Sequence, residues 1–287
     1  MHMSLMLLAV TAVCLTRLWV FRAALPLVSR WQHTLGLFLF APLFLLAMAV
    51  AILGMGTRGQ MLGLPVGWIG YSVSLGFLGV AVGLVLWRGW LGWRSLQQVR
   101  TQPAVLVHQA SIPMTARVLN TSMPFAAQVG FWQPELVLSQ GALVHLSPDQ
   151  LTAVLTHEQA HLHYRDTFWF FWLGWLRQLT SWLPYTEALW QELLLLRELR
   201  ADRWAAQQVD ALLIAEALLL MTRAPLLDAE SCAMFGATAP LHRLEERINA
   251  LLTDTTDADA DASSEIHIPW MWLALALLPL FTVMLHR

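Results

Sequence analysis

Long apolar runs dominate this chain and are separated by shorter polar stretches. Four runs approach the length of a membrane span and cover residues 5–21, 35–53, 68–87 and 269–285. A helix of about 20 apolar residues crosses the roughly 30 Å hydrocarbon core of a bilayer. We therefore expect a multi-pass membrane protein. For the first run a cleaved signal peptide is the alternative, but its arginines follow the apolar stretch, which favours an uncleaved helix.

The composition agrees with this interpretation. Of the 287 residues, 57% are hydrophobic and only 13% are charged, and the lipid bilayer is the expected partner. Trp87, Trp90 and Trp93, interleaved with Arg88 and Arg94, predict a helix at the membrane–water interface. The net charge of −2 offers no basic surface, so we expect no nucleic acid partner.

The arginines also set the expected orientation. Positive residues are retained on the cytoplasmic side of a membrane, and the segment after the third run is richer in arginine than the loop before it. We expect three transmembrane helices in residues 1–87, a cytoplasmic domain in 88–252, an acidic flexible linker in 253–267 and a last transmembrane helix in 268–287. The arginines used are Arg22 and Arg30 after the first run, Arg58 after the second, and Arg88, Arg94 and Arg100 after the third.

Residues 104–139 are β-rich instead of continuously apolar. Short runs at 104–107, 117–119, 125–131 and 135–138 are punctuated by proline and asparagine, a pattern typical of strands joined by turns. We expect a small, mainly antiparallel sheet. The run 125–131 is a candidate edge strand that takes up a substrate peptide by strand addition; a purely structural sheet is the alternative.

A helix with a well-marked start follows these strands. Ser147 is a suitable N-cap, Pro148 fits the first turn, and Gln150 completes a capping box. Apolar residues continue at helical spacing beyond the cap. They are Leu151, Val154, Leu155 and Leu162.

The same helix carries a metal-binding pattern. His157 and His161 are four residues apart and lie on one face, so both imidazoles can reach one metal ion. Glu158 is then placed to take a proton from a water molecule at that ion and to act as the catalytic base. Two imidazoles and a carboxylate suit one catalytic Zn²⁺, which keeps a further position open for water.

The expected third ligand is Glu198. It opens the pattern Glu198-Leu-Arg-Ala-Asp202, in which Asp202 lies one turn further on and can accept the outer N–H of a ligand histidine. A His-Glu-x-x-His helix with a distant Glu-x-x-x-Asp helix is the arrangement of gluzincins. His163, Glu187 and Glu192 are poorer candidates, because His163 points off the metal face and the glutamates lack the matching aspartate.

The segment between these two patterns, 167–197, is apolar and Trp-rich around a turn at Pro184. A single span here would leave Glu198 across the membrane from His157. We therefore expect a helical hairpin whose two arms return Glu198 to the level of His157. The hairpin either dips into or lies along the membrane, or it is an ordinary amphipathic core hairpin; both alternatives remain open.

Further residues are candidates for supporting roles. Asp166 either hydrogen-bonds a ligand histidine or simply ends the helix. A second donor to the oxyanion of peptide hydrolysis is expected from one of four side chains. His242 is the candidate stabiliser, and a polar surface residue at a helix start is the alternative for it. The set is Tyr164, Tyr185, His242 and Arg247.

Several of these segments resemble known membrane metallopeptidases. Residues 130–139, 146–161 and Arg165-Asp166 resemble the BlaR/MecR-type integral-membrane zinc metallopeptidases, and residues 198–205 and 241–251 are similar to the related heat-shock and CAAX-prenyl membrane endopeptidases. The resemblance implies zinc ligation by His157, His161 and Glu198 and catalysis by Glu158. The chain ends at Arg287 without the penicillin-sensing domain of those sensors, so β-lactam sensing by such a domain is not expected.

These observations give one leading hypothesis. The expected fold class is a mainly α, multi-pass membrane protein with an inserted α+β, zincin-like (gluzincin) metalloprotease domain. The expected function is zinc-dependent endopeptidase activity at the cytoplasmic face of the plasma or inner membrane, with a BlaI-like repressor as a candidate substrate in signalling. A quality-control protease for membrane proteins and a non-catalytic transmembrane signal transducer are the alternatives.

Overall fold

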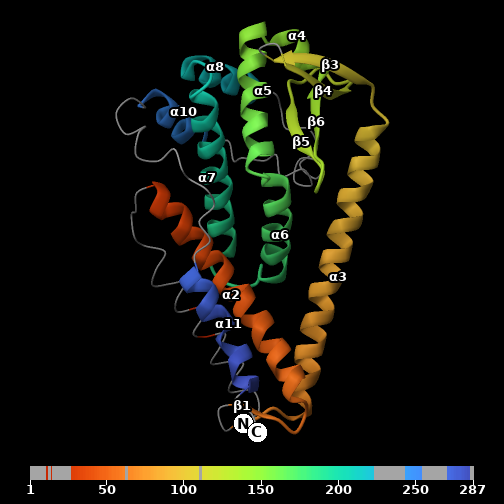
Figure 1. The fold of residues 1–287 in the computed structure, drawn as a ribbon, viewed down its shortest axis with the longest axis vertical. Helices are drawn as coiled ribbons and strands as arrows, with labels where there is room; N and C mark the ends of the chain where they lie inside the picture. Colours follow the sequence, from red (N-terminus) through yellow and green to blue (C-terminus); the bar gives the residue numbers. More distant parts are fainter. Residues whose placement is uncertain are drawn as a thin grey trace. The chain divides into compact units, whose positions relative to one another are not determined.

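The computed structural model describes residues 11, 14, 27–61, 64–109, 112–222, 243–253 and 270–284. The protein is mostly helical, with a four-stranded sheet and a two-stranded hairpin (Figure 1). Its residues form two compact units. The first unit combines Met1–Trp87, Leu173–Leu193 and Asp261–Arg287, and the second unit combines Arg88–Trp172 and Leu194–Ala260.

Long apolar helices make up most of the first unit. Helix α2 covers Leu27–Met55, a short hairpin of β1 (Gln60–Met61) and β2 (Leu64–Pro65) follows, and α3 begins at Gly67. Helix α11, Trp270–Met284, packs along α2. The contact is close at Gly36, where an added Cβ would lie only 2.3 Å from Cδ1 of Trp272. Glycine is therefore required at this crossing.

Among the described residues, two helices are long and apolar enough to cross a membrane. They are Arg30–Met55 within α2 and Gly67–Arg100, which is α3. Helix α11 is shorter at 15 residues, and the expected span 5–21 lies almost entirely outside the described residues. Helix α3 continues without a break from the apolar run through the Trp- and Arg-rich segment to Arg100, so the expected interfacial segment is the end of the same helix.

The sheet belongs to the second unit and is mixed. Its strands are β3 (Ala104–Gln109), β4 (Ile112–Leu119), β5 (Ala126–Val129) and β6 (Glu135–Ser139), in the order β3-β4-β6-β5. The β3–β4 and β5–β6 pairs are antiparallel, whereas β4 and β6 are parallel. The parallel pair arises because the chain first forms the outer strand β5 and then returns between β4 and β5 as β6. Strand β5 therefore lies at an edge, at the position expected for 125–131.

Helix α5, Pro148–His163, packs its apolar face on this sheet. Leu155 is fully buried and contacts Leu136 and Leu138 of β6 together with Val107 and Ala116. Burying a leucine side chain contributes about 1.5–3 kcal/mol, so this contact fixes the helix that carries the histidines. Along the chain, the short helix α4, Gln140–His145, follows β6 and precedes α5, and the Ser139 side chain caps its start.

The remaining described helices follow α5 in the chain. They are α6 (Asp166–Leu179), α7 (Thr186–Ala206), α8 (Ala211–Thr222) and α10 (Leu244–Leu252). Helices α6 and α7 form a helical hairpin across residues 180–185, as the sequence predicts. At its tip, which belongs to the first unit, Leu183 packs on Ala41 of α2, and Nε1 of Trp175 donates a hydrogen bond to the carbonyl of Ala81 in α3 at 2.8 Å.

Candidate metal centre

Helix α5 presents its histidines in its last two turns. Its start is fixed by the predicted capping box, which is confirmed: the Ser147 hydroxyl accepts from the Gln150 amide at 3.2 Å, and the Gln150 side chain accepts from the Ser147 amide at 3.1 Å. The helix ends at Tyr164, and Arg165 adopts a left-handed conformation with φ 53°. This turn starts α6 at Asp166, beside the end of α5.

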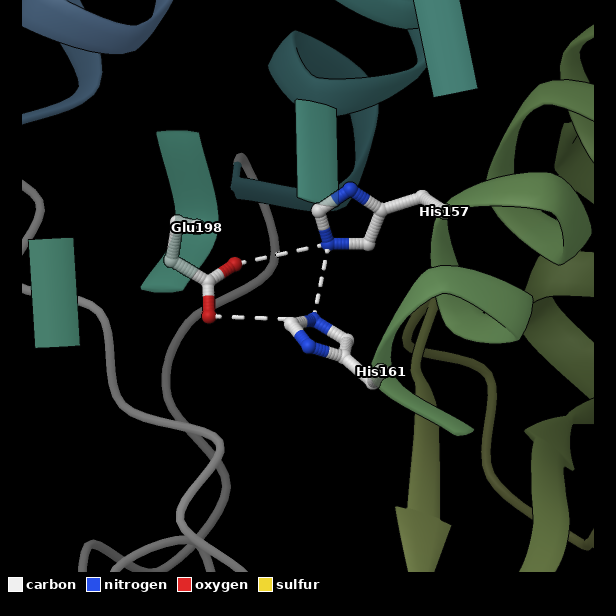
Figure 2. Close-up of side chains that lie close together, drawn as sticks. All are labelled: His157, His161 and Glu198. Atoms are coloured by element: carbon white, nitrogen blue, oxygen red, sulfur yellow. Dashed lines mark hydrogen bonds and ion pairs between the residues drawn. The ribbon is translucent and has the colours of Figure 1, made fainter. Parts of the chain in front are cut away.

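Three potential ligand atoms converge between α5 and α7 (Figure 2). The Nε2 atoms of His157 and His161 are 3.1 Å apart. Oε2 of Glu198 lies 3.4 Å from Nε2 of His157, and Oε1 of Glu198 lies 3.8 Å from Nε2 of His161. The sequence separates Glu198 from the histidines by about forty positions, and the α6–α7 hairpin brings them together.

These separations fit a small tetrahedral ion. Bonds of about 2.0–2.1 Å in a tetrahedral arrangement place neighbouring ligand atoms about 3.3 Å apart. The 3.1 Å between the two Nε2 atoms and the 3.4 Å from Oε2 of Glu198 to Nε2 of His157 lie close to that value, whereas the 3.8 Å contact of His161 is with the other oxygen of Glu198. With one atom taken from each residue, the three ligand atoms lie within 4.8 Å of one another. His157, His161 and Glu198 can therefore hold a metal ion with small side-chain adjustments.

Each imidazole is held through its other nitrogen by an aspartate. Nδ1 of His161 lies 2.7 Å from Oδ2 of Asp166, and Nδ1 of His157 lies 2.9 Å from Oδ1 of Asp202. The first contact is a well-formed hydrogen bond; the second has hydrogen-bond length but poorer alignment. Both aspartates favour a proton on Nδ1 and leave Nε2 available as the ligand atom.

Buried arginines neutralise the carboxylates. Arg247 of α10 binds both oxygens of Asp202 at 2.7 Å and reaches Oε2 of Glu198 at 3.2 Å. Arg200 binds Asp166, and Arg197 binds Oε1 of Glu198. Such paired geometry suits guanidinium, because its donors form a planar fork that matches a carboxylate. All 17 basic residues of the chain are arginine, and three of them serve here.

The charges shift the pKa values in the metal-free site. Burial lowers the pKa of His157, but hydrogen bonding and attraction to Asp202 and Glu198 outweigh burial and raise it to about 10. Burial raises the pKa values of Glu198 and Asp202, yet the neighbouring arginines and histidines hold both below the usual range. Burial also opposes the charge of Arg247, whose pKa is nevertheless raised by the same carboxylates.

Glu158 lies on the same turn of α5 and is 7% exposed. Its Oε2 is buried and has no hydrogen-bond partner among the described atoms. A buried carboxylate oxygen without a partner is costly unless water or an ion completes it. The main-chain carbonyl of Glu158 accepts a hydrogen bond from the buried Gln128 side chain of β5 at 3.3 Å, which ties the edge strand to the helix at this residue.

Of the other residues singled out from the sequence, Arg247 belongs to the site, where its donors bind Asp202 and Glu198. Tyr185 belongs to the first unit, and His242 falls outside the described part of the chain. The remaining contacts are His163 stacked on Trp204, Tyr164 beneath the Arg200 guanidinium, Glu187 paired with Arg177, and Glu192 paired with Arg30.

Sequence reasoning missed Gln128, Arg197 and Arg200. Arg197 and Arg200 flank the ligand position Glu198 in the chain, but a charged residue next to a ligand is usually solvent-exposed. The one available signal was the absence of lysine, because arginine is the residue suited to buried carboxylate pairs.

Comparisons with known proteins found no matching family model, no matching curated protein and no matching solved structure. The resemblance to membrane metallopeptidases therefore remains an expectation from the sequence motifs.

Proposed function

We propose that this protein is a membrane-bound, zinc-dependent endopeptidase. The observation that carries the proposal is the convergence of His157, His161 and Glu198, together with Glu158 on the same helix turn, whose buried Oε2 has no hydrogen-bond partner among the described atoms. A structural metal site needs no free carboxylate next to it. A hydrolytic site does, because a base must accept the proton of the attacking water.

Zinc is the ion that best matches the donor set. Two neutral imidazoles and one carboxylate are common ligands of catalytic zinc, which keeps one further position open. When bound, the ion supplies a Lewis acid that polarises the substrate carbonyl and lowers the pKa of water to about 7.

Side chains of the protein supply the proton transfers and hold the ligand histidines in position. Glu158 accepts the proton of the water whose oxygen bonds to the peptide carbonyl carbon, and it returns this proton to the amine as the C–N bond breaks. Asp166 and Asp202 hold the imidazoles in orientation, and Arg247 keeps Asp202 ionised. Since Arg247 is committed to these carboxylates, it is a positioning residue, and the oxyanion donor must come from another group.

The edge strand β5 suits a peptide substrate. It is paired only with β6 among the described strands, and Gln128 links it to α5 at Glu158. An extended peptide added along the side of β5 opposite β6 would make main-chain hydrogen bonds that are independent of side-chain identity. This supports a protein or peptide substrate in preference to a small amide.

Membrane attachment is supported by the two helices of span length. We infer that α2 and α3 cross the plasma or inner membrane and that the arginines after residue 87 place the second unit in the cytoplasm. A cytoplasmic repressor, as the resemblance to BlaR/MecR-type peptidases implies, is one substrate proposed for this site.

The test compares metal content and proteolysis in matched variants. Wild-type protein in detergent should contain about one zinc per chain by mass spectrometry and cleave denatured casein. Glu158→Gln should keep the zinc and lose about 10²–10⁴-fold in cleavage rate, whereas Glu198→Ala should lose the metal. Glu245→Gln, at an exposed position of α10, is the control and should change neither. Full cleavage by Glu158→Gln would refute the proposal.

A further inference from the structure

An aromatic cluster lies next to the candidate metal centre within the second unit. Phe131 and Trp132 come from the β5–β6 turn, and Phe168, Phe171 and Trp172 come from the first turns of α6. Ring centroids are 5.0 Å apart for Phe131–Phe168, 4.8 Å for Phe131–Phe171 and 5.2 Å for Trp132–Phe168. The other four rings of the cluster are half-buried, whereas Trp132 is 72% exposed.

The turn that carries Trp132 depends on a glycine. Gly130 has φ +133°, and a Cβ there would lie 3.0 Å from Cα of Pro134 and 3.1 Å from the carbonyl oxygen of Gln133. Such a conformation strongly favours glycine. After the turn, Glu135 is anchored to Arg117 at 2.9 Å. The exposed indole of Trp132 therefore lies on a turn whose backbone conformation depends on Gly130.

The cluster is attached to α3 where its apolar run ends. Arg88 is the first charged residue after the apolar stretch 67–87, and its guanidinium lies 5.6 Å from the Phe171 ring centroid. On the next turns of α3, Trp90 and Trp93 are 42% and 58% exposed, and Arg94 lies over the Trp90 ring at 4.9 Å. Exposed tryptophans paired with arginines are typical of the headgroup region of a bilayer.

We propose that the aromatic cluster around Trp132 is a second membrane contact, seated in the headgroup region of the bilayer that α3 crosses. Lipid is the occupant that accounts for both observations, the exposed indole and the contact with Arg88 at the end of the apolar run. Trp132 then anchors the β5–β6 turn to the membrane as Trp90 and Trp93 anchor α3.

This contact fixes the distance between the metal centre and the lipid headgroups. The substrate class that follows from this distance rests on the proposed function. Asp166 and Phe171 lie on one helix, five residues and thus about 8 Å apart along its axis. Asp166 is bonded to the ligand histidine His161. The scissile bond is therefore cleaved within about 10 Å of the headgroups, and the substrate class is the segment of a membrane-anchored protein that directly follows its anchor.

Depth measurement tests the contact independently of activity. A nitroxide is attached to Gln133→Cys in full-length protein whose two native cysteines are serine, reconstituted in phosphatidylcholine–phosphatidylglycerol vesicles. Gln133 is exposed, and labelling at this position leaves the Trp132 side chain unchanged. The control is Val144→Cys on α4, a position 70% exposed. We expect oxygen to relax the Gln133 label more than a water-soluble nickel chelate does, and the reverse for Val144.

Two results would overturn the contact. One is a Gln133 label as accessible to the nickel chelate as the Val144 label. The other is a Gln133 label shielded from both reagents, which would show that a protein surface, such as a second copy of this chain, covers the cluster.

A series of substrates tests the inferred distance between the site of cleavage and the membrane. The same cleavable segment is placed at increasing distance from a transmembrane anchor in co-reconstituted vesicles. An extended chain spans about 3.3 Å per residue, so cleavage should begin with the scissile bond about three to five residues beyond the anchor. A requirement for ten or more residues would overturn the inferred distance. Absence of cleavage at every length, with casein also intact, would refute the proposed function while the depth result still decides the membrane contact.

Discussion

Asp166 is the first residue of α6, yet its Oδ2 lies 2.7 Å from Nδ1 of His161 near the end of α5. The left-handed conformation of Arg165 interrupts the helix between α5 and α6, so that Asp166 begins a new helix directly after the end of α5. Asp166 is only 2% exposed and is also bound by Arg200 of α7. One carboxylate thus joins the helix of the histidines, the following helix and the helix of Glu198.

Asp166→Asn should weaken metal binding without removing a ligand. The amide no longer fixes the His161 tautomer by charge, and losses of this kind cost about 10–100-fold in affinity. Competition of the metal-free protein with a chromogenic zinc chelator measures the effect. Asp149→Asn, in the exposed first turn of α5, is the control and should keep wild-type affinity. Equal affinity in the two variants would contradict a role of Asp166 in holding His161.

Arg247→Gln should destabilise the metal-free protein strongly. Asp202 is 1% exposed and loses both of its guanidinium contacts. Breaking a buried ion pair in this way costs about 3–5 kcal/mol. Because a bound cation offsets part of the uncompensated negative charge, added zinc should restore part of the loss. Denaturant unfolding with and without zinc measures both effects.

The control for Arg247 is Arg203→Gln, an exposed position of α7, which should shift the free energy of unfolding by less than about 0.5 kcal/mol. A mild effect of Arg247→Gln in metal-free protein would show that Asp202 does not depend on this arginine.

The stability of the second unit should depend on the charge of Glu135. Hydrogen bonds from Arg100 at 2.6 Å and Arg117 at 2.9 Å hold the pKa of this carboxyl below its ordinary value of 4.5. A lowered folded-state pKa stabilises the fold above the unfolded-state pKa, and this contribution is lost as the pH falls through the folded-state pKa. Glu135→Gln should therefore cost up to about 1 kcal/mol at neutral pH.

The difference between wild type and Glu135→Gln should shrink as the pH falls below 4.5 and disappear below the lowered folded-state pKa of Glu135. Thermal unfolding of both proteins across this range checks the sign, because groups shared by the two proteins cancel in the comparison. A difference that stays constant with pH would show that the ion pairs contribute nothing through charge.

Leu155→Ala should be among the more damaging core substitutions. Leu155 is fully buried between α5 and the sheet, and removing a buried leucine side chain costs about 2–5 kcal/mol through lost burial and the cavity left behind. Val144→Ala, at a position 70% exposed, should be nearly neutral. Denaturant midpoints of the two variants give the comparison, and similar midpoints would contradict the packing of α5 on the sheet.

Local patterns in the sequence determined the elements that carry the chemistry. The Ser147 cap predicted the start of α5, and the four-residue spacing of His157 and His161 predicted a common face, because a helix repeats every 3.6 residues. The short β-rich runs predicted the strands, and the apolar runs predicted α2 and α3. Each of these depends on neighbours within a few positions, which is the range over which backbone geometry fixes side-chain direction.

Only the tertiary structure decided which distant groups meet. It placed β6 in parallel register beside β4, brought Glu198 to the two histidines, and set Arg197, Arg200 and Arg247 against the buried carboxylates. No local pattern predicts that an arginine will be buried, because its burial is favourable only when a carboxylate from another part of the chain is buried with it. That mutual dependence between residues far apart in sequence is settled by packing, and it turns two histidines on a helix into a candidate metal centre.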